Sequence, residues 1–269
     1  MSDCTVITSA RNPKVKALAD LWESSRTRRE RGLFAVEGKR EVLRCATGGY
    51  SIDTLYFCTE ITSEAERAEI VARCNGVSDI ILLDGYAYSK AAVRGSTEGV
   101  MATVRAKTLS LSDIKLEDAP LILVAESVEK PGNLGALLRT ADAAGADAVI
   151  ICDPLTDLYN PNLIRASLGA AFTVPTVATT SEDAIFWLKS HSIRIYTAQL
   201  QDSEWYYDTD MKCGTAIVLG SEADGLTDIW RKAADAHIRI PMLGVVDSLN
   251  VSASAAILAY EAVRQRQCK

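Results

Sequence analysis

The sequence holds too few metal-binding and disulfide-forming residues for a metal centre or a disulfide framework. It has only two histidines, and its seven cysteines are scattered, odd in number and never arranged as C-x-x-C. Structural zinc sites need several such ligands at characteristic spacings, and a disulfide framework needs paired cysteines. We therefore expect no metal, and we expect the cysteines to be reduced thiols, several of them buried.

Long apolar runs are also missing. No apolar run approaches the roughly 18 residues of a membrane-spanning helix, and the N-terminus lacks the pattern of a signal peptide. The sequence contains no internal repeat and no low-complexity tract. With 269 residues, the chain is long enough for two domains with substantial cores. These features predict a cytoplasmic protein that has no membrane partner.

Positive charge is scarce over most of the chain but is concentrated near the N-terminus. The net charge is −6, whereas residues 1–45 hold ten Lys and Arg against six Asp and Glu, which leaves −10 on the remainder. Contacts to a phosphate backbone require such clustering, because each neutralised phosphate releases a condensed counterion. The alternative is a solvated helix face, the usual fate of a charge run. The cluster comprises Arg26, Arg28, Arg29, Arg31, Lys39, Arg40 and Arg44.

The segment from Ile240 to Tyr260 combines the end of a strand, an open turn and the start of a helix. An apolar run stops at Pro241, and a glycine turn then leads to Asp247-Ser-Leu-Asn250 and to a helix rich in small residues. Ser248 or Asn250 can cap that helix by accepting its free N–H groups. A proline and a glycine after a strand leave main-chain groups free for a ligand. Taken alone, the segment is equally compatible with an ordinary strand, turn and capped helix.

Two earlier segments share this design. Residues 121–126 form an apolar run that is followed by the loop 127–135 and a helix over 136–144, and residues 215–219 form a run that leads into Gly220-Ser-Glu-Ala-Asp-Gly-Leu226. In chain order the three segments read P-G-N-L-G-x-x-x-R, L-G-S-E-x-x-G-L and I-P-M-x-G-x-x-x-S-L-N-V-S. Together they resemble the three motifs of the SpoU/TrmH family of RNA 2′-O-ribose methyltransferases, and the resemblance extends from Leu121 to Arg266.

This resemblance implies that the chain transfers the methyl group of S-adenosylmethionine (AdoMet) to a ribose 2′-hydroxyl. The hydroxyl attacks the methyl carbon in line with the departing sulfur, so the enzyme has to align the reactants and needs no metal. Apolar walls suit an adenine, and open loops offer its edge backbone hydrogen bonds. For Leu219, Ile240 and Leu249 the alternative is plain core packing. By resemblance, the residues around the cofactor are Leu219, Gly220, Ile240, Met242, Ser248, Leu249 and Asn250.

Arg139 is the residue that the resemblance singles out for catalysis. The role that the resemblance implies for it is to activate the 2′-hydroxyl. A free arginine is too basic to lose its proton, which leaves as an equal alternative that it binds the adjoining phosphate and stabilises the developing alkoxide. Asn133 holds the loop or orients the ribose, and Glu222 positions Arg139 or the RNA. For the Arg139–Glu222 pair the alternative is a surface salt bridge worth little. The implied catalytic set is Arg139, Asn133, Glu222, Ser248 and Asn250.

The stretch from Tyr159 to Gly169 also resembles the family and implies that Arg165 and Ser167 face RNA phosphates. The second motif departs from the commonest form at Ser221, where asparagine is frequent, and at Ala223-Asp224, where a glycine-containing pair is usual. Serine still offers a hydrogen bond, whereas the aspartate adds negative charge near an RNA surface. With the N-terminal cluster, the expected RNA-binding residues are Arg28, Arg29, Arg31, Lys39, Arg40, Arg165 and Ser167.

Residues 1–105 resemble the small substrate-binding domain that precedes the catalytic domain in many SpoU members and is related in fold to RNA-binding ribosomal proteins. The stretches 8–16 and 31–42 carry this resemblance. Pro13 suits the first turn of a helix, and Ser63 and Glu66 have capping-box spacing. We expect helices over 12–23, 38–46 and 63–74, strands over 54–58, 80–83 and 99–104, and a linker over 106–119.

Residues 120–269 alternate between strands and helices, which favours a parallel sheet with helices on both faces and an α/β fold. Pattern alone favours an unknotted sheet, because true knots are nearly absent among folds. The resemblance instead implies a SPOUT fold, in which residues of about 217–266 thread a loop and form a deep trefoil knot. The expected strands are 121–126, 148–152, 174–178, 193–198, 215–219 and 236–240.

Two other interpretations lead to different functions. In a nicotinamide-dependent oxidoreductase, Asp153 would be the ribose-binding acid about 20 residues after the loop glycines. However, the loop offers only Gly132 and Gly135 and not G-x-G-x-x-G. The second alternative is a catalytically inactive relative that binds RNA or shields it from antibiotics, which the joint presence of the five catalytic residues argues against.

The resemblance also bears on the substrate and the assembly. By analogy with the family, the two-domain form favours large-subunit ribosomal RNA as the substrate. Transfer RNA is the alternative substrate. We expect a homodimer built through the C-terminal domain, because the small side chains of residues 252–256 would let a second helix approach and Tyr260 and Val263 would add apolar contact. The alternative is that these small residues fit the helix against its own sheet.

Overall fold

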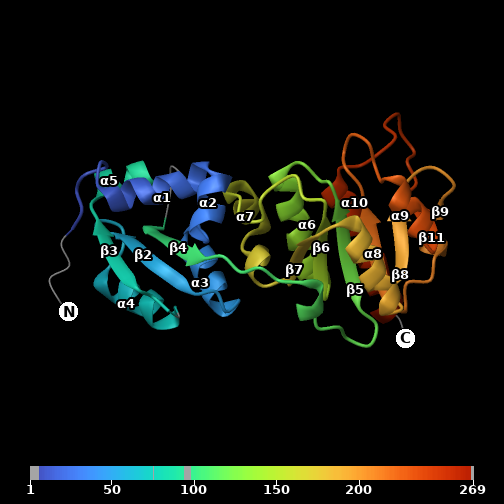
Figure 1. Ribbon diagram of the computed structural model, residues 1–269, viewed down its shortest axis with the longest axis horizontal. Helices are drawn as coiled ribbons and strands as arrows, with labels where there is room; N and C mark the ends of the chain where they lie inside the picture. Colours follow the sequence, from blue (N-terminus) through green and yellow to red (C-terminus); the bar gives the residue numbers. More distant parts are fainter. Residues whose placement is uncertain (1–5, 75, 94–97, 268–269) are drawn as a thin grey trace. The chain divides into compact units, whose positions relative to one another are not determined.

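The computed structural model describes residues 6–74, 76–93 and 98–267, and the chain divides into two compact units (Figure 1). The first unit comprises Met1–Lys107 together with the short segment Leu158–Ile164. The second comprises Thr108–Asp157 and Arg165–Lys269. Within the described ranges, no helix has the length and apolar character that crossing a membrane requires.

A four-stranded mixed sheet forms the centre of the first unit, in the order β1-β4-β2-β3. β4 (Val100–Arg105) is antiparallel to both β1 (Leu33–Glu37) and β2 (Ile52–Cys58), and β2 is parallel to β3 (Asp79–Leu83). The predicted strands are therefore confirmed, whereas β1 was not predicted.

Helices cover both faces of this sheet (Figure 1). On one face, Val15, Leu18 and Leu21 of α1 pack with Tyr88 of α5 against the strands. The helices α3 and α4, which contact each other, cover the opposite face. The helices of the first unit are α1 (Pro13–Glu23), α2 (Ser25–Arg31), α3 (Lys39–Thr47), α4 (Glu64–Arg73) and α5 (Gly85–Ala91).

The local signals that predicted α1 and α4 operate as expected. The Asn12 side chain accepts a hydrogen bond from the Lys14 N–H and caps α1, with Pro13 in the first turn. Ser63 and Glu66 form the reciprocal capping box of α4. The short helices α2 and α5 were not predicted, because seven residues leave little room for a helical period.

The segment Leu158–Ile164 belongs to the first unit although it lies far along the chain. The Tyr159 ring stacks on Phe34 with 4.1 Å between ring centroids, and its hydroxyl donates to the Lys107 carbonyl at 2.5 Å. The Lys107 Nζ lies 4.5 Å from the centroid of the Tyr50 ring. These contacts join the segment to β1 and to the residues that follow β4.

The second unit is built on a seven-stranded sheet in which every neighbouring pair is parallel. The central strands are buried along their whole length, as expected for a sheet that is covered on both faces. The two-residue edge strand β9 was not predicted. In sheet order, the strands are β7 (Thr176–Thr179), β6 (Ala148–Cys152), β5 (Leu121–Glu126), β10 (Thr215–Leu219), β8 (Arg194–Ala198), β11 (Ala236–Arg239) and β9 (Glu204–Trp205).

Two helices pack on each face of this sheet. α6 (Pro131–Ala144) and α10 (Val251–Gln267) contact each other on one face. On the other face, Leu188 of α8 (Ser181–Ser190) and Trp230 of α9 (Asp228–Ala233) join a core with the central strands. The predicted α/β class with a parallel sheet is confirmed. Strand boundaries differ by one or two residues, and the largest difference is at α6, which begins at Pro131 rather than at residue 136.

Short helical elements complete the chain. α7 (Pro161–Ser167) follows the Tyr159 segment. Single 3-10 turns occur at η1 (Leu111–Asp113), η2 (Ala170–Phe172) and η3 (Tyr206–Asp208).

The described cysteines are free thiols, in agreement with the expectation. Cys45, Cys58 and Cys152 are buried, and burial raises the pKa of the Cys45 and Cys152 thiols well above the usual value, so these thiols stay neutral. Cys4 and Cys268 lie outside the described residues.

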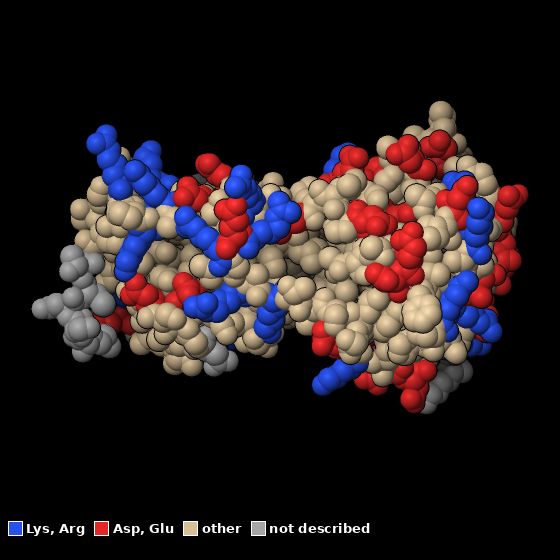
Figure 2. All heavy atoms as spheres, in the orientation of Figure 1, with Lys and Arg blue, Asp and Glu red and all other residues tan. Residues whose placement is uncertain are grey.

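The two units differ in surface charge. On the face shown in Figure 2, Lys and Arg are the more frequent charged side chains on the first unit, and Asp and Glu are the more frequent on the second unit, although each unit carries both signs. This contrast agrees with the charge balance of the sequence, in which the N-terminal part is basic and the remainder acidic.

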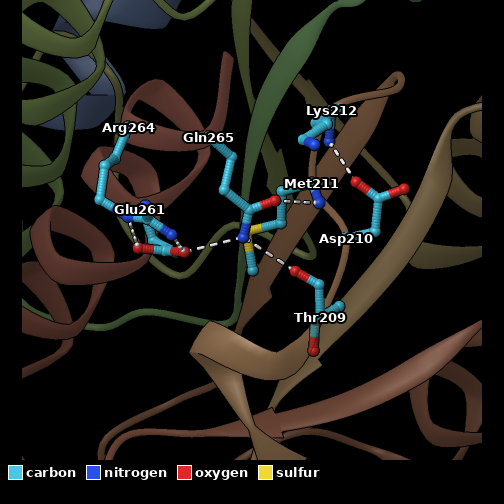
Figure 3. Close-up of polar contacts among 7 residues, drawn as sticks. All are labelled: Thr209, Asp210, Met211, Lys212, Glu261, Arg264 and Gln265. Carbon is cyan, nitrogen blue, oxygen red and sulfur yellow. Dashed lines mark hydrogen bonds and ion pairs between the residues drawn. The ribbon is translucent and has the colours of Figure 1, made fainter. Parts of the chain in front are cut away.

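The last turns of α10 are tied to the loop between η3 and β10 (Figure 3). Gln265 Oε1 accepts from the Met211 N–H at 2.8 Å, and Gln265 Nε2 donates to the Thr209 carbonyl at 2.9 Å. The Arg266 guanidinium donates to the carbonyls of Met211, Cys213 and Pro120 at 3.0, 2.8 and 3.2 Å. The last turn of α10 is thereby held to two distant segments of its own unit.

Candidate active site

Asn133 connects the loops that carry the three sequence motifs. Its Nδ2 donates to Glu222 Oε1, and its Oδ1 accepts from Asn250 Nδ2 at 3.1 Å. Asn250 Oδ1 in turn accepts from the Ser252 N–H at 3.0 Å, so Asn250 caps α10 as predicted. Asn133, Glu222 and Asn250 come from the first turn of α6 and from the loops after β10 and β11, so the site forms where parallel strands end.

The loop after β10 holds Glu222 in a tight turn. Ser221 and Gly225 exchange main-chain hydrogen bonds of 3.1 Å, and Ser221 Oγ accepts from the Asp224 N–H at 3.0 Å. A Cβ atom on Gly220 would lie 2.2 Å from the Gly225 carbonyl carbon, so only glycine fits there. The serine that replaces the commoner asparagine therefore supports the turn itself.

A buried carboxylate fixes the end of this loop. Glu126, the last residue of β5, is 2% exposed and accepts from the Thr227 N–H at 2.9 Å. Ser181 Oγ lies 3.4 Å from Glu126 Oε1 and donates to Asp153 Oδ2 at 2.6 Å. Asp153, the candidate ribose-binding acid of an oxidoreductase, thus accepts a hydrogen bond from the first residue of α8.

Arg139 is set apart from this network. It is exposed on α6, about 9 Å along the helix axis from Asn133 at about 1.5 Å per residue, and it makes no hydrogen bond or ion pair with any described residue. The expected Arg139–Glu222 pair is not formed. An exposed and unpaired guanidinium is available to a phosphate or to a developing oxyanion.

A cavity opens at the carboxyl ends of β8 and β11. Four of the predicted cofactor residues line it, namely Ile240, Met242, Ser248 and Leu249. Leu219 is buried in the sheet, Gly220 closes the turn described above, and Asn250 binds Asn133, so these three are not among the described lining residues. Ser248 Oγ donates to Asp247 Oδ1 at 3.1 Å at the rim.

Sequence reasoning missed the residues that complete this cavity. Gln199 and Leu200 follow β8, Arg239 ends β11, and Ser254 and Leu258 come from α10. The signal that could have found Gln199 and Arg239 is their place at the carboxyl ends of parallel strands, where open α/β sheets bind ligands.

The cavity has the chemistry of a nucleoside pocket. Its walls include Ile238, Ile240 and Leu258, while Gln199 Oε1 and Arg239 Nε are buried polar atoms without a hydrogen-bond partner among the described residues. Apolar walls with a few unpaired polar groups are what a nucleoside requires. The residues present therefore fit the cofactor that the motifs imply.

The predicted RNA-binding residues of the first unit do not share one environment. Arg29 and Arg31 are exposed on α2, although Arg31 lies 3.7 Å from Asp20. Lys39 Nζ lies 3.7 Å from Glu69, and Arg40 donates to Glu41 at 2.6 Å. These four retain exposed cationic groups.

Two predicted RNA contacts are placed inside the fold instead. Arg28 is 4% exposed and donates to the Leu21 carbonyl at 2.6 Å, so it holds α2 against α1. Ser167 is fully buried, and its Oγ accepts from the Gly169 N–H at 3.2 Å. Burial removes both from contact with RNA, whereas Arg165 is exposed on α7.

Comparison with known proteins identifies relatives over nearly the whole chain. Residues 120–260 match the SpoU rRNA Methylase family, and residues 12–102 match the MRM3-like substrate binding domain. The 23S rRNA (guanosine(2553)-2′-O)-methyltransferase RlmP of Bacillus subtilis is 29% identical over 259 residues, which cover 94% of this chain and 97% of RlmP.

Solved structures agree in fold. A crystal structure of an RNA 2′-O ribose methyltransferase has a TM-score of 0.84 and 36% identity, covering 97% of this chain and 99% of that one. An AdoMet-bound rRNA methyltransferase from Sinorhizobium meliloti has a TM-score of 0.88 and 28% identity, covering 97% of both chains. The chain therefore belongs to the SpoU rRNA methylase family and is an RNA 2′-O-ribose methyltransferase that uses AdoMet.

Proposed function

We propose that the enzyme methylates the 2′-hydroxyl of one ribose in 23S rRNA. The named activity of the Bacillus subtilis relative, which aligns with 94% of this chain, supports this substrate. The observation that carries the proposal is the bridge from Asn133 to Glu222 and Asn250, because it joins the three motif loops into one polar site.

We propose that the two domains have different roles, with the boundaries that the sequence predicts. Residues 1–105 bind the RNA, residues 106–119 link the domains, and residues 120–269 carry out the methyl transfer. The cluster of Lys and Arg between Arg26 and Arg44 supports the first of these roles, since a polyanion is held by clustered Lys and Arg. Arg29, Arg31, Lys39, Arg40 and Arg165 are the proposed phosphate contacts.

The protein's contribution to catalysis is alignment and electrostatic stabilisation. AdoMet supplies a methyl group that its sulfonium already activates. Arg139 binds the phosphate next to the target ribose and stabilises the negative charge that develops on the 2′-oxygen, whose proton is released to solvent water. Asn133 and Glu222 hold the ribose in line with the methyl carbon, which converts a bimolecular encounter into an oriented one.

The cofactor-binding residues that we propose are those of the third motif and its neighbours. Ile240, Met242 and Leu249 would form walls around the cofactor, and Ser248 and Asn250 would fix the loop that carries this motif. Leu219 and Gly220 act indirectly, because they shape the turn that carries Glu222.

We further propose that the C-terminal segment, from about residue 217 to 266, is knotted. The hydrogen bonds from Arg266 to Pro120 and from Tyr260 to the Ala143 carbonyl support this proposal, because they bring α10 back to the segments around β5 and α6. A knot in this place would hold the third motif against the first.

A homodimer through the second unit is the proposed working form. Ala253, Ala256 and Tyr260 lie on the outer side of α10, where small side chains permit close approach of another helix. On the preceding loop, Leu243 and Val245 are 98% and 104% exposed, and covering such side chains is favourable. The enzyme would act in the cytoplasm, where ribosomal RNA is assembled.

Transfer of radiolabel from AdoMet tests the substrate. The purified enzyme would be incubated with protein-free 23S rRNA, with assembling large subunits and with transfer RNA, and labelled sites mapped by primer extension. We expect a single 2′-O-methylated ribose in 23S rRNA. Label confined to transfer RNA would contradict the substrate, and RNA binding without any transfer would indicate an inactive relative.

A further inference from the structure

Glu126, the last residue of β5, is a carboxylate in a place that does not favour one. It is 2% exposed, and it forms no ion pair with any described residue. A second carboxylate, Asp153, approaches the same Ser181 hydroxyl, which lies 2.6 Å from Asp153 Oδ2 and 3.4 Å from Glu126 Oε1. A buried charge without a cation lowers stability unless hydrogen bonds offset it. The groups that donate to Glu126 therefore indicate what this carboxylate is for.

The two close donors both belong to Thr227, where the loop after β10 ends. The Thr227 N–H donates to Glu126 Oε2 at 2.9 Å, and Thr227 Oγ1 donates to Oε1 at 2.5 Å. Each oxygen of the carboxylate thus holds one group of the same residue. Thr227 is also the N-cap residue of α9, yet its side chain forms no capping hydrogen bond there. A threonine hydroxyl at this position usually caps the helix, whereas here it binds Glu126.

Glu126 stands where two catalytic loops leave the sheet. Ser127 has a φ of 50°, which a serine seldom adopts, so β5 ends abruptly and the loop that leads to Asn133 begins. β10 pairs with β5 along the whole of its length, and the loop after β10 carries Glu222 and ends at Thr227. Glu126 therefore ties together the two loops that meet again where Asn133 donates to Glu222.

The turn between Glu222 and Thr227 is stiff, so a shift at one is passed to the other. Ser221 and Gly225 exchange two main-chain hydrogen bonds across this turn. Leu226, which connects the turn to Thr227, is buried in the core beneath it. Close-packed segments transmit displacements because they have no free space to absorb them. The contact of Thr227 with Glu126 thus helps to set the orientation of Glu222.

We infer that Glu126 is a positioning residue for the methyl transfer. Through Thr227 it keeps Glu222 in contact with Asn133. Glu126 itself is buried and is not among the described lining residues of the cavity, so it touches neither the cofactor nor the RNA. This inference rests on the proposed role of Glu222 in holding the ribose. A misplacement of about 1 Å can slow an enzyme by about 100-fold, so Glu126 governs the rate of transfer and not cofactor affinity.

Single-turnover transfer from radiolabelled AdoMet, to the RNA that the wild-type enzyme labels, tests this inference. Glu126→Gln keeps the shape of the side chain but has one acceptor oxygen, so one Thr227 donor faces an N–H group. Its rate should fall at least about tenfold. Its affinity for S-adenosylhomocysteine, measured by calorimetry, should stay within about threefold of wild type. Thr227→Val, which loses only the hydroxyl, should slow transfer at least about threefold, whereas Thr227→Ser keeps both donors and should match the wild type.

Ser181→Ala is the matched control within the same buried network. It removes the partner of the Trp230 indole N–H, which donates to Ser181 Oγ at 2.9 Å, so the Tm should fall. The Ser181 proton is directed to Asp153 and not to the loop that carries Glu222, so the rate should stay within about twofold of wild type. If Glu126 served stability alone, Glu126→Gln would resemble this control, with a lower Tm and an almost unchanged rate. All rates are measured well below the Tm of each variant.

A double variant tests whether Glu126 acts through Glu222. Glu222→Gln should slow transfer by itself, and adding Glu126→Gln should slow it by less than a further twofold or so, because residues that act in series are not additive. If Glu126→Gln transfers at the wild-type rate, or if the two losses multiply, the inference is wrong although the proposed function stands. If Glu222→Gln keeps the wild-type rate, the proposed role of Glu222 falls together with the inference. Should Glu126→Gln not fold, the rate of Thr227→Val decides in its place.

Discussion

At the scale of single residues, the site depends on a side-chain amide that uses both its donor and its acceptor. Asn133 donates to Glu222 and accepts from Asn250, which an aspartate could not do because it lacks the donor. Arg139 is the opposite case, since it is exposed and unpaired among the described residues. A residue that binds nothing in the free protein is suited to bind the substrate.

Replacing Arg139 tests that role. Arg139→Ala should lower single-turnover methyl transfer by at least about 100-fold, on the scale of losing one group that stabilises developing charge. AdoMet affinity, measured by calorimetry on the same preparation, should stay within a few-fold of wild type, because Arg139 is not among the described lining residues of the cavity. Lys232→Ala, an exposed cation on α9, is the control and should change neither quantity. Near-normal turnover in Arg139→Ala would refute the role.

Tyr56 provides a residue-scale prediction on pH. Burial raises the pKa of its hydroxyl from 10.0 to about 12, with the nearby Asp53 as a smaller cause. The unfolded chain therefore loses this proton at lower pH than the folded chain, so the tyrosine's contribution to stability is complete below pH 10 and declines between pH 10 and about 12. In urea unfolding at pH 9 and 11, Tyr56→Phe should lose less stability than wild type; an equal loss would contradict the argument.

At the scale of elements, the short helix α2 carries two different kinds of arginine. Arg28 is buried and holds the helix to α1, while Arg29 and Arg31 are exposed. The sequence shows only an unbroken basic run, and no periodic pattern in seven residues distinguishes the inner position from the outer ones.

Substitutions in α2 should separate binding from stability. Arg29→Ala with Arg31→Ala should weaken RNA binding and flatten its dependence on salt, because fewer counterions are released, with little change in Tm. Arg28→Ala should instead lower the Tm, since the Leu21 carbonyl loses its partner. A salt titration by filter binding and a thermal melt report the two effects. If the salt dependence of RNA binding is unchanged in the double variant, Arg29 and Arg31 do not contact RNA and only form a solvated helix face.

The end of α10 is the second element with a distinct prediction. Arg266→Ala should lower the free energy of unfolding by about 2 kcal/mol, because three carbonyls lose a charged donor. Arg264→Ala is the matched control in the same helix, and its loss should be below about 1 kcal/mol because its side chain is 58% exposed. Equal losses in urea unfolding would show that the carbonyl contacts contribute nothing specific.

The strands and motifs were predictable because they leave local signals. Apolar runs and caps located β5, β10 and α4, and the motif letters singled out Asn133, Glu222 and Asn250. The start of α6 was misplaced because Pro131, Gly132 and Gly135 are typical of loops, although Pro131 in fact fits the first turn of a helix. Other features depend on contacts across the fold: the bond from Thr227 to Glu126 spans 101 positions. Likewise, no sequence pattern reveals that Gln199 Oε1 and Arg239 Nε are buried without a hydrogen-bond partner among the described residues.

At the scale of the whole molecule, the division of charge between the units bears on how an acidic protein holds RNA. The chain as a whole is negative, yet the first unit presents Lys and Arg. A dimer would give one RNA two such units, and the second unit's acidic surface would discourage unproductive contacts with the polyanion.

Light scattering tests the dimer directly. At micromolar concentration we expect about twice the mass of the chain, and Tyr260→Arg together with Ala256→Glu on the outer side of α10 should shift the protein toward the monomer by placing charge in the contact. Tyr86→Arg, an exposed aromatic substitution in the first unit, serves as the control and should leave the mass unchanged. A fully active monomer in the wild type would refute the proposal.

The position of Leu158–Ile164 affects which fragments of the protein can fold on their own. A fragment that stops at Lys107 would lack Tyr159 and leave the stacked face of Phe34 open to water. Such a fragment should express poorly or aggregate, even though the sequence match to the substrate-binding domain ends at residue 102. For the same reason, a chimaera of two relatives with a single junction after this unit would separate Tyr159 from Phe34. A transfer of RNA specificity between relatives therefore has to include the segment Leu158–Ile164 as well.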